Sequence, residues 1–195
     1  LIFAVGATAL SMILGGTAAW ITERFDTPLQ GLTKIGTLIP LIMPGIFYAI
    51  AWALLLAPGG GMINVWLRDT FHLSASKGPV NIYSLGGMIW VEGVKDAPFV
   101  YLLIMPLIRS TDSSFEQAAR VSGAGIWTVL RRITIPLSIP GILSIVLFRM
   151  VRGLEAFEVP AIIGLPKGVT VLATKIYTVI SETHSYSMAN AYGLG

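Results

Sequence analysis

Four apolar runs, each roughly 20 residues long, constrain the fold of this chain more than any other feature. A helix of that length is long enough to cross the ~30 Å hydrocarbon core of a bilayer. The runs therefore predict an all-α, polytopic membrane protein. We expect spans at residues 1–22, 35–57, 85–108 and 133–152, and a further span starting near residue 186.

The composition agrees with a membrane protein. Hydrophobic residues make up 54% of the chain and charged residues only 12%, whereas soluble domains carry about 25% charged residues. The absence of cysteine excludes disulfides, thiolate metal sites and a cysteine nucleophile. A net charge of +3 gives no indication of a nucleic-acid partner.

The basic residues of the loops predict the orientation of the spans. Cytoplasmic loops of membrane proteins carry an excess of Lys and Arg. Loops on the side of the polar segment 110–132 hold six such residues and loops on the other side hold three, which places this segment in the cytoplasm. The six are Arg24, Lys34, Arg109, Arg120, Arg131 and Arg132, and the three are Arg68, Lys77 and Lys167.

The polar segment at residues 110–132 lies between two predicted spans and has strong helix signals. Ser113 can cap a helix start, and Glu116 three residues later completes a capping box. Gly123 suits a helix C-terminus, where a left-handed residue is needed. Residues 126–132 have the spacing of a second short helix. Two helices around a glycine turn predict a rigid, water-exposed knob between the spans.

Several motifs resemble permease subunits of bacterial ABC importers. Gln117-Ala118-Ala119, Gly123 and the Ile-Thr-Ile-Pro sequence at 133–136 resemble their cytoplasmic "EAA" loop, with Gln117 where the family usually has Glu. Residues 97–99, 106–112 and 154–166 look like the subgroup that imports ferric iron, which borders those for polyamines, thiamine and phosphonates. Ser113 stands where that subgroup often has Pro. The resemblance covers nearly all of the chain.

This resemblance implies a fold, a location and a set of partners. It implies one permease domain over residues 1–195, part of a longer permease in a bacterial inner membrane. The implied partners are cytoplasmic ABC ATPase subunits, a second permease half and an extracytoplasmic substrate-binding protein. ATP binding in the ATPases would rock the spans between inward-open and outward-open states. The implied ATPase-coupling residues are Ser113, Glu116, Gln117, Ala118, Ala119 and Gly123.

No motif for catalysis, a cofactor or a metal is present in the sequence. Gly59-Gly60-Gly61 lacks the Lys-Ser/Thr that completes a phosphate loop, so ATP hydrolysis is expected in a separate subunit. His72 and His184 are far apart and have no ligands at metal-binding spacing. A Gly-x-Ser-x-Gly nucleophile motif is also missing. We therefore predict a protein that is not itself an enzyme and has no cofactor.

Charged residues in or beside the outer ends of two spans have two interpretations. They are Glu92, Lys95, Asp96, Arg149, Arg152, Glu155 and Glu158. Ionisable groups at membrane depth tend to face a cavity or one another. The first interpretation is a polar, outward-facing vestibule on the substrate path. The second is local pairing at i,i+3, Glu92 with Lys95 and Arg152 with Glu155.

Paired prolines occur in three successive spans, at Pro40/Pro44, Pro98/Pro106 and Pro136/Pro140. Each proline removes a backbone hydrogen bond and kinks its helix. Broken helices are tolerated in membranes where they line a cavity or pack on protein. The prolines therefore indicate either a substrate path between these spans or kinks that serve packing alone. The predicted path residues are Pro40, Pro44, Glu92, Asp96, Glu155 and Glu158.

Two classes of function are consistent with these features. The first is the permease subunit of an ATP-driven, binding-protein-dependent importer for ferric iron or a related small solute. The second is a membrane channel or scaffold that works without ATP, in which the 110–132 segment is only a structural turn. The two differ in whether an ATPase partner is required.

Overall fold

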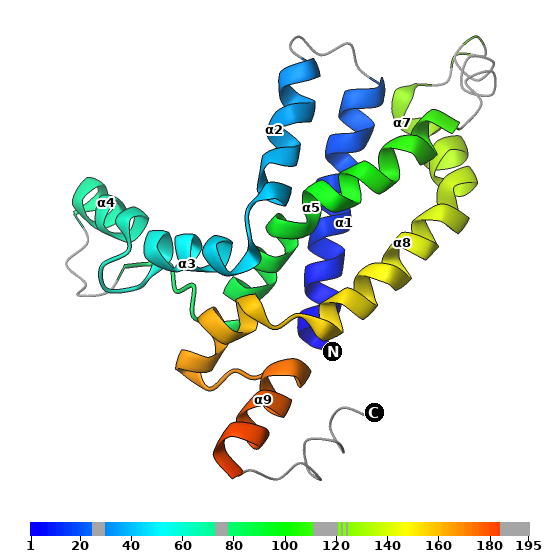
Figure 1. Ribbon diagram of the computed structural model, residues 1–195. Helices are drawn as coiled ribbons and strands as arrows, with labels where there is room; N and C mark the ends of the chain where they lie inside the picture. The colour runs from blue at the N-terminus through cyan, green and yellow to red at the C-terminus, as the bar shows by residue number, and fades with distance from the viewer. Residues whose placement is uncertain (25–29, 73–77, 111–120, 122, 124, 184–195) are drawn as a thin grey trace.

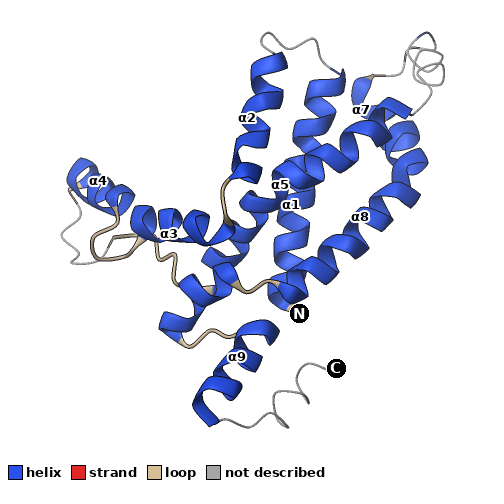
Figure 2. Ribbon diagram, viewed as in Figure 1, coloured by secondary structure: helices blue, strands red, loops and turns tan. Residues whose placement is uncertain are grey.

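The computed structural model describes residues 1–24, 30–72, 78–110, 121, 123 and 125–183. Every regular element in these residues is a helix (Figure 2). The α-helices are α1 (Ile2–Arg24), α2 (Gln30–Ile42), α3 (Gly45–Leu56), α4 (Met62–Phe71), α5 (Leu85–Ser110), α7 (Ile126–Val129), α8 (Ile135–Glu155) and α9 (Leu172–Thr183). Two π-helical segments, η1 (Leu130–Thr134) and η2 (Pro160–Gly164), and one 3₁₀ turn, η3 (Leu165–Lys167), complete them.

Helices α1, α5 and α8 form the centre of the molecule (Figure 1). Small residues let these helices approach closely, as expected where packing replaces the hydrophobic effect in lipid. A Cβ added at Gly15 of α1 would lie 2.8 Å from Cβ of Val100 in α5. A Cβ at Gly153 of α8 would lie 3.1 Å from Cα of Ala4. The glycines therefore set the distances between the three helices.

The ends of the helices sort into two groups. The C-terminal ends of α1 and α5, the N-terminal end of α2, and α7 lie at one end of the molecule, at the top of Figure 1. Helix α9 lies at the opposite end, and α4 projects to the left side (Figure 1).

Two of the described helices are long and apolar enough to cross a membrane, Ile2–Glu23 in α1 and Ile135–Glu155 in α8. Helix α5 has the length, with 26 residues. Every 18-residue stretch within it, however, includes Lys95, Asp96 and either Glu92 or Arg109. The predicted third span is therefore a long helix whose outer half is charged.

The predicted second span is bent sharply rather than straight. Its two halves, Ile35–Ile42 in α2 and Gly45–Leu56 in α3, meet at 104°. Pro44 precedes the first residue of α3. Proline has no N–H to donate and disfavours α-helical geometry in the residue before it. The kink predicted here is thus a sharp corner, with Pro44 at the bend.

The spacing predicted a separate short helix at residues 126–132, and this prediction is wrong. Helix α7 continues without interruption into η1 and then into α8. Within η1 the hydrogen bonds span five residues, as in the bond from the N–H of Ile135 to the carbonyl of Leu130. Pro136 is the second residue of α8, and in an ordinary α-helix its ring would clash with the carbonyl four residues earlier. A π segment is a known way to accommodate such a defect.

A single buried asparagine holds the long loop after α3 together. The side-chain amide of Asn64, in α4, donates to the carbonyls of Leu56 (3.1 Å), Ala57 (3.0 Å) and Val80 (2.8 Å). Its oxygen accepts a hydrogen bond from the N–H of Val80 at 3.1 Å. Asn64 is fully buried. Helix α4 is therefore fixed both to the end of α3 and to the segment that leads to α5.

Two apolar clusters lie at different heights along α5. One contains Met88 and Val91 together with side chains from α1, α3 and η2. The other contains Val100, Tyr101 and the residues that follow, with side chains from α1 and α8. Three charged residues of α5, Glu92, Lys95 and Asp96, lie in the interval between these clusters. The fold thus places a polar layer between two apolar ones.

Candidate functional site

A polar cleft of about 240 Å³ lies between the outer half of α5, the end of α8 and the segment that follows α8. It brings together all the charged residues that the sequence singled out near the outer ends of the spans. Lining it are Glu92, Lys95 and Asp96 from α5, Arg149, Arg152 and Glu155 from α8, and Ala156, Phe157 and Glu158. These residues therefore share one cleft, and their role on a substrate path stays a prediction.

Three ion pairs cross or line the cleft. Glu92 and Lys95 pair within α5 at 2.8 Å, and Arg152 and Glu155 pair within α8 at 3.3 Å. These are the two local pairs that the spacing predicted. Arg149 pairs with Asp96, which joins α8 to α5. The sequence alone did not indicate this last pair, because its partners are 53 residues apart.

Glu158 is the one carboxylate of the cleft without a basic partner among the described residues. Its side chain packs against Gly45, where an added Cβ would overlap the carboxylate. Gly45 begins α3 immediately after the corner at Pro44. The cleft has four carboxylates and three basic groups. Pairing therefore leaves one negative charge, on Glu158, beside the bend between α2 and α3.

Two buried polar atoms in the cleft have no hydrogen-bond partner among the described residues, Oε2 of Glu92 and Nε of Arg149. Both residues are only 4% exposed. Buried polar groups are almost always hydrogen-bonded in folded proteins. These two atoms therefore offer one acceptor and one donor to a polar group that enters the cleft, such as a hydrated ion or a water molecule.

The structure separates the two prolines of the predicted path. Pro44 lies at the corner next to Gly45, and so beside Glu158. Pro40 lies inside α2 and does not line the cleft. Of the predicted path residues, the four acidic ones share the cleft and Pro44 borders it. No group of three or more His, Cys, Asp or Glu side chains that could hold a metal ion is found in the described part of the chain.

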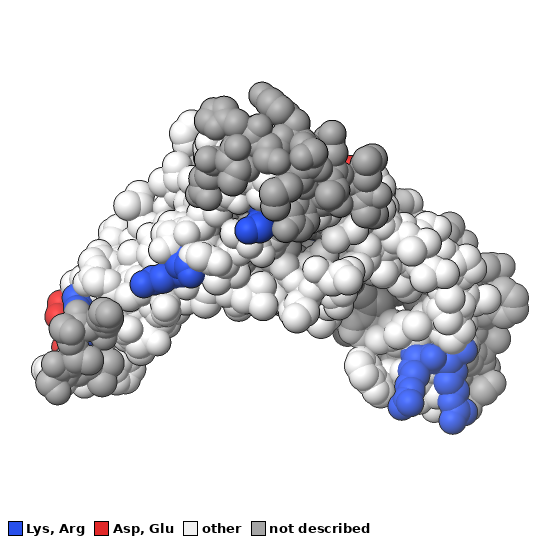
Figure 3. Space-filling model, turned by 90° about the horizontal axis from the view of Figure 1, so that it is seen from below, with Lys and Arg blue, Asp and Glu red and all other residues white. Residues whose placement is uncertain are grey.

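Much of the molecule's surface is uncharged, as expected for contact with lipid. The face seen from below in Figure 3 is mostly free of Lys, Arg, Asp and Glu. Large apolar side chains of α8 are exposed, among them Leu143, Leu147 and Phe148. Since α8 is long enough to cross a membrane, this exposed face lies within the bilayer or against another membrane-embedded helix.

Most of the predicted coupling residues lie outside the described part of the chain, namely Ser113, Glu116, Gln117, Ala118 and Ala119. Gly123 is described and has φ +84°, the left-handed conformation predicted for it. Nothing lies within 4 Å of a Cβ added there. Its conformation therefore favours glycine through the backbone and not through crowding.

A further ion pair fixes the point where the 110–132 segment leaves α5. Arg109 donates from Nε and Nη2 to the two carboxylate oxygens of Glu23, at 2.7 and 2.9 Å. These hydrogen bonds raise the pKa of Arg109. Sequence reasoning counted Arg109 only as a basic loop residue. The sequence did hold a signal for this pair, because Glu23 and Arg109 carry opposite charges at the ends of two predicted spans on the same side of the membrane.

The chain is similar in sequence to a family of transport proteins. A sequence model of the family described as "Binding-protein-dependent transport system inner membrane component" matches residues 7–192. The molybdenum transport system permease protein ModB of Escherichia coli K12 is 28% identical over 177 residues, which are 89% of this chain and 74% of that protein. ModB of Haemophilus influenzae is 31% identical over 155 residues, 79% of this chain and 64% of that protein.

Other relatives carry different substrates in their names. The trehalose transport system permease protein SugA of Mycobacterium tuberculosis is 27% identical over 164 residues, 77% of this chain and 52% of that protein. Among solved structures, a bacterial ABC transporter that imports alginate matches with a TM-score of 0.79 at 22% identity, over 99% of this chain and 72% of that one. This likeness shows the fold.

The fold, the apolar helices and the family match agree over nearly the whole chain. The relatives divide between molybdenum and sugar transport, so they do not specifically support the ferric iron subgroup that the motifs resembled. They do support a multi-pass protein of the inner membrane. The chain belongs to the family of binding-protein-dependent transport system inner membrane components, as an ABC importer permease subunit.

Proposed function

We propose that this chain forms half of the path of an ATP-driven importer and takes its energy from separate ATPase subunits. The family match over residues 7–192 carries this proposal. The alginate transporter, whose structure was solved in complex with a substrate-bound periplasmic protein, has the same fold and supports an external binding protein as partner. The 110–132 segment would contact the ATPase, and the polar cleft would receive the solute.

The mechanism is alternating access driven by a rigid connection. The Glu23–Arg109 pair ties the end of α5 to α1 beside the coupling segment. From that end α5 runs as one helix to the charged interval that lines the cleft. Movement of the coupling segment would therefore turn α5 and α1 together and change the access to the cleft. The acidic path residues Glu92, Asp96, Glu155 and Glu158 would meet the solute there.

A matched pair of glycine variants tests the coupling role. Gly123→Val forces a β-branched residue into a left-handed conformation, whereas Gly125 has no such conformation and equally open surroundings. We expect Gly123→Val to leave the protein in the membrane but to lower ATP-dependent uptake at least about ten-fold, and Gly125→Val to have little effect. Equal uptake by the two variants, or uptake without any ATPase, would favour the channel or scaffold alternative.

The substrate proposal is a small charged solute, and ferric iron is our first candidate. The unpaired Glu158 leaves the cleft with one net negative charge, which suits a cation. An oxyanion is the second candidate, because two relatives at 28% and 31% identity are named for molybdenum transport. Calorimetric titration of the cognate binding protein with ferric iron and with molybdate decides between them. Binding of molybdate alone would remove the iron proposal.

A further inference from the structure

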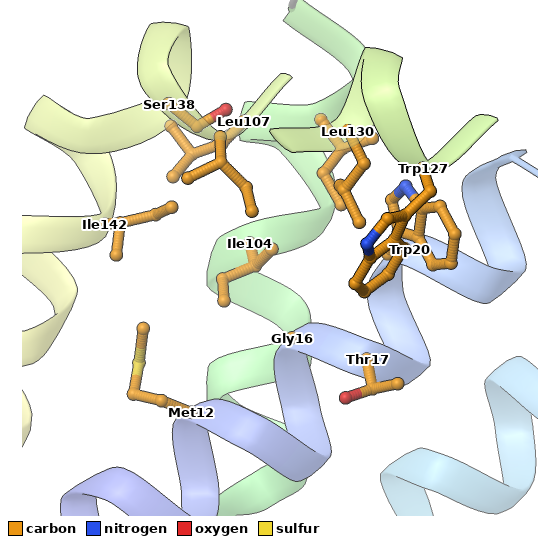
Figure 4. Close-up of a pocket in the computed structure, with 12 residues that line it drawn as sticks. Met12, Gly16, Thr17, Trp20, Ile104, Leu107, Trp127, Leu130, Ser138 and Ile142 are labelled. Carbon is orange, nitrogen blue, oxygen red and sulfur yellow. The ribbon is translucent and has the colours of Figure 1, made fainter. Parts of the chain in front are cut away.

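An apolar pocket of about 310 Å³ lies between α1, α5 and the run from α7 to α8 (Figure 4). Met12, Ile104 and Ile142 line it from the three sides. No charged side chain belongs to its lining among the described residues. Its volume falls at the small end of the range for ligand-binding pockets, about 300–1,000 Å³.

A basic hollow lies next to this pocket and shares one lining residue with it. Trp127 of α7 lines both, and its side chain is 70% exposed. In Figure 4 its indole lies beside that of Trp20 from α1. The hollow is completed by Thr128, Arg131 and Arg132. Neither guanidinium has an acidic partner in the described part of the chain.

The position of the two cavities relates them to the membrane. The pocket walls include α1 and α8, the two helices long and apolar enough to span a bilayer. Tryptophan is enriched where such helices meet the headgroup layer. Arg131 and Arg132 follow Trp127 by about one helical turn, so they extend from the same end of the pocket. Trp127 and the two arginines therefore lie together at the end of the pocket where α8 starts, and the apolar interior extends from there along the span.

The pocket wall also holds one polar atom without a partner. Oγ of Ser138, in the first turn of α8, has no hydrogen-bond partner among the described residues and belongs to a side chain that is only 8% exposed. The hydroxyl of Thr17 on the opposite wall is already bonded to the carbonyl of Ile13. A ligand with a polar group between its head and its apolar tail would give Ser138 the missing partner.

We propose that the apolar pocket and the basic hollow form one site for an anionic phospholipid of the surrounding bilayer. The phosphate binds Arg131 and Arg132, and an acyl chain enters the pocket between Met12, Ile104 and Ile142. An unpaired pair of guanidinium groups selects a lipid with net negative charge over a zwitterionic one, since basic pockets at helix ends bind anionic head groups. The bound lipid connects the start of α8 to α1 and α5 across the pocket.

The test measures lipid binding to the purified transporter, isolated as it assembles in the membrane and stripped of lipid in detergent. Phosphatidylglycerol and phosphatidylcholine are titrated separately, and native mass spectrometry counts the bound molecules. We expect tighter binding of phosphatidylglycerol. Arg131→Gln/Arg132→Gln should weaken it on the order of twenty-fold, about five-fold for each charge. Lys167→Gln/Lys175→Gln removes two exposed basic groups near α9 instead and should leave the affinity unchanged.

A second variant addresses the pocket and not the charges. Ile142→Trp fills the apolar pocket while both arginines remain, and we expect it to remove the same bound phosphatidylglycerol. Two results together would overturn the proposal: inorganic phosphate displaces the lipid, and the Ile142→Trp variant still binds phosphatidylglycerol normally. They would mean that the hollow holds a free anion. Unchanged lipid binding by Arg131→Gln/Arg132→Gln would overturn it as well, and loss of the ATPase from that variant would assign the arginines to a protein contact.

Discussion

Arg149 is a buried charged residue of the cleft whose stability depends on a partner from another helix. It is 4% exposed, pairs with Asp96 and leaves Nε without a partner in the described part of the chain. Removing one partner of a buried ion pair leaves an uncompensated charge, whereas replacing both by apolar residues is often neutral. The pair therefore joins α5 and α8 only while it is complete.

This asymmetry gives a prediction for the pair. Asp96→Ala should lower the free energy of unfolding by about 3–5 kcal/mol, because Arg149 remains buried without its partner. Asp96→Leu/Arg149→Met should recover most of that loss. Thermal unfolding of the purified variants measures both. Glu155→Ala breaks the exposed pair with Arg152 and serves as the control with little effect. A double variant as unstable as Asp96→Ala would contradict this account.

The contact between Gly45 and Glu158 gives a second prediction. A methyl group at Gly45 overlaps the carboxylate, which can move away because it ends a flexible side chain. Gly45→Ala should therefore change thermal stability little but displace Glu158 from the corner. We expect uptake to fall several-fold, as for Glu158→Gln. Gly36→Ala is the control in α2, with nothing within 4 Å of the added methyl. Full uptake by Gly45→Ala would separate Glu158 from the solute path.

At the scale of the elements, α4 depends on the hydrogen bonds of Asn64. Asn64→Leu leaves the carbonyl groups of Leu56, Ala57 and Val80 without this donor. Because each buried unsatisfied group costs about 1–3 kcal/mol, we expect a loss of roughly 3 kcal/mol or more and a clearly lower Tm. Asn81→Leu is the control in the same loop, because it removes only one exposed hydrogen bond, from the N–H of Tyr83 at 3.0 Å. Similar melting of the two variants would show that Asn64 does not fix the loop.

The sequence predicted those elements whose structure is determined by residues close together in the chain. The apolar runs located α1, α5 and α8, and Gly123 was predicted to be left-handed from its place after a helix. Proline at position 44 predicted a defect but not its size, because the 104° corner depends on how α3 packs with η2 and α5. The π segment before Pro136 was likewise missed, since several backbone arrangements accommodate a proline.

The cleft shows the same limit for the site. Its charged residues were found from their unusual depth in apolar runs, and the two i,i+3 pairs followed from helix geometry. The Arg149–Asp96 pair and the Gly45–Glu158 contact join distant parts of the chain. Only the packing of α8 on α5, and of the corner on the segment after α8, brings these residues together.

At the scale of the whole molecule, the Glu23–Arg109 pair joins the end of α1 to the end of α5 beside the proposed coupling segment. Arg109→Glu should lower ATP-dependent uptake, because two carboxylates then face each other where α5 meets α1. The exchange Glu23→Arg/Arg109→Glu should restore part of it. Uptake into vesicles that contain the complete transporter measures both, with membrane level checked by immunoblot. Uptake that stays equally low in the exchange variant would mean that the local residue identities, not the pairing, matter.

The π turn of residues 130–134 rotates the side chains of α7 about the helix axis relative to those of α8. A five-residue hydrogen-bond ring holds one residue more than an α-turn, and one residue corresponds to about 100° of rotation. Trp127 therefore points in a direction that a regular helix from α7 to α8 would not give it. Deleting a single residue there would restore ordinary helical phase and swing the tryptophan away from Trp20, even though every other side chain remained in the chain.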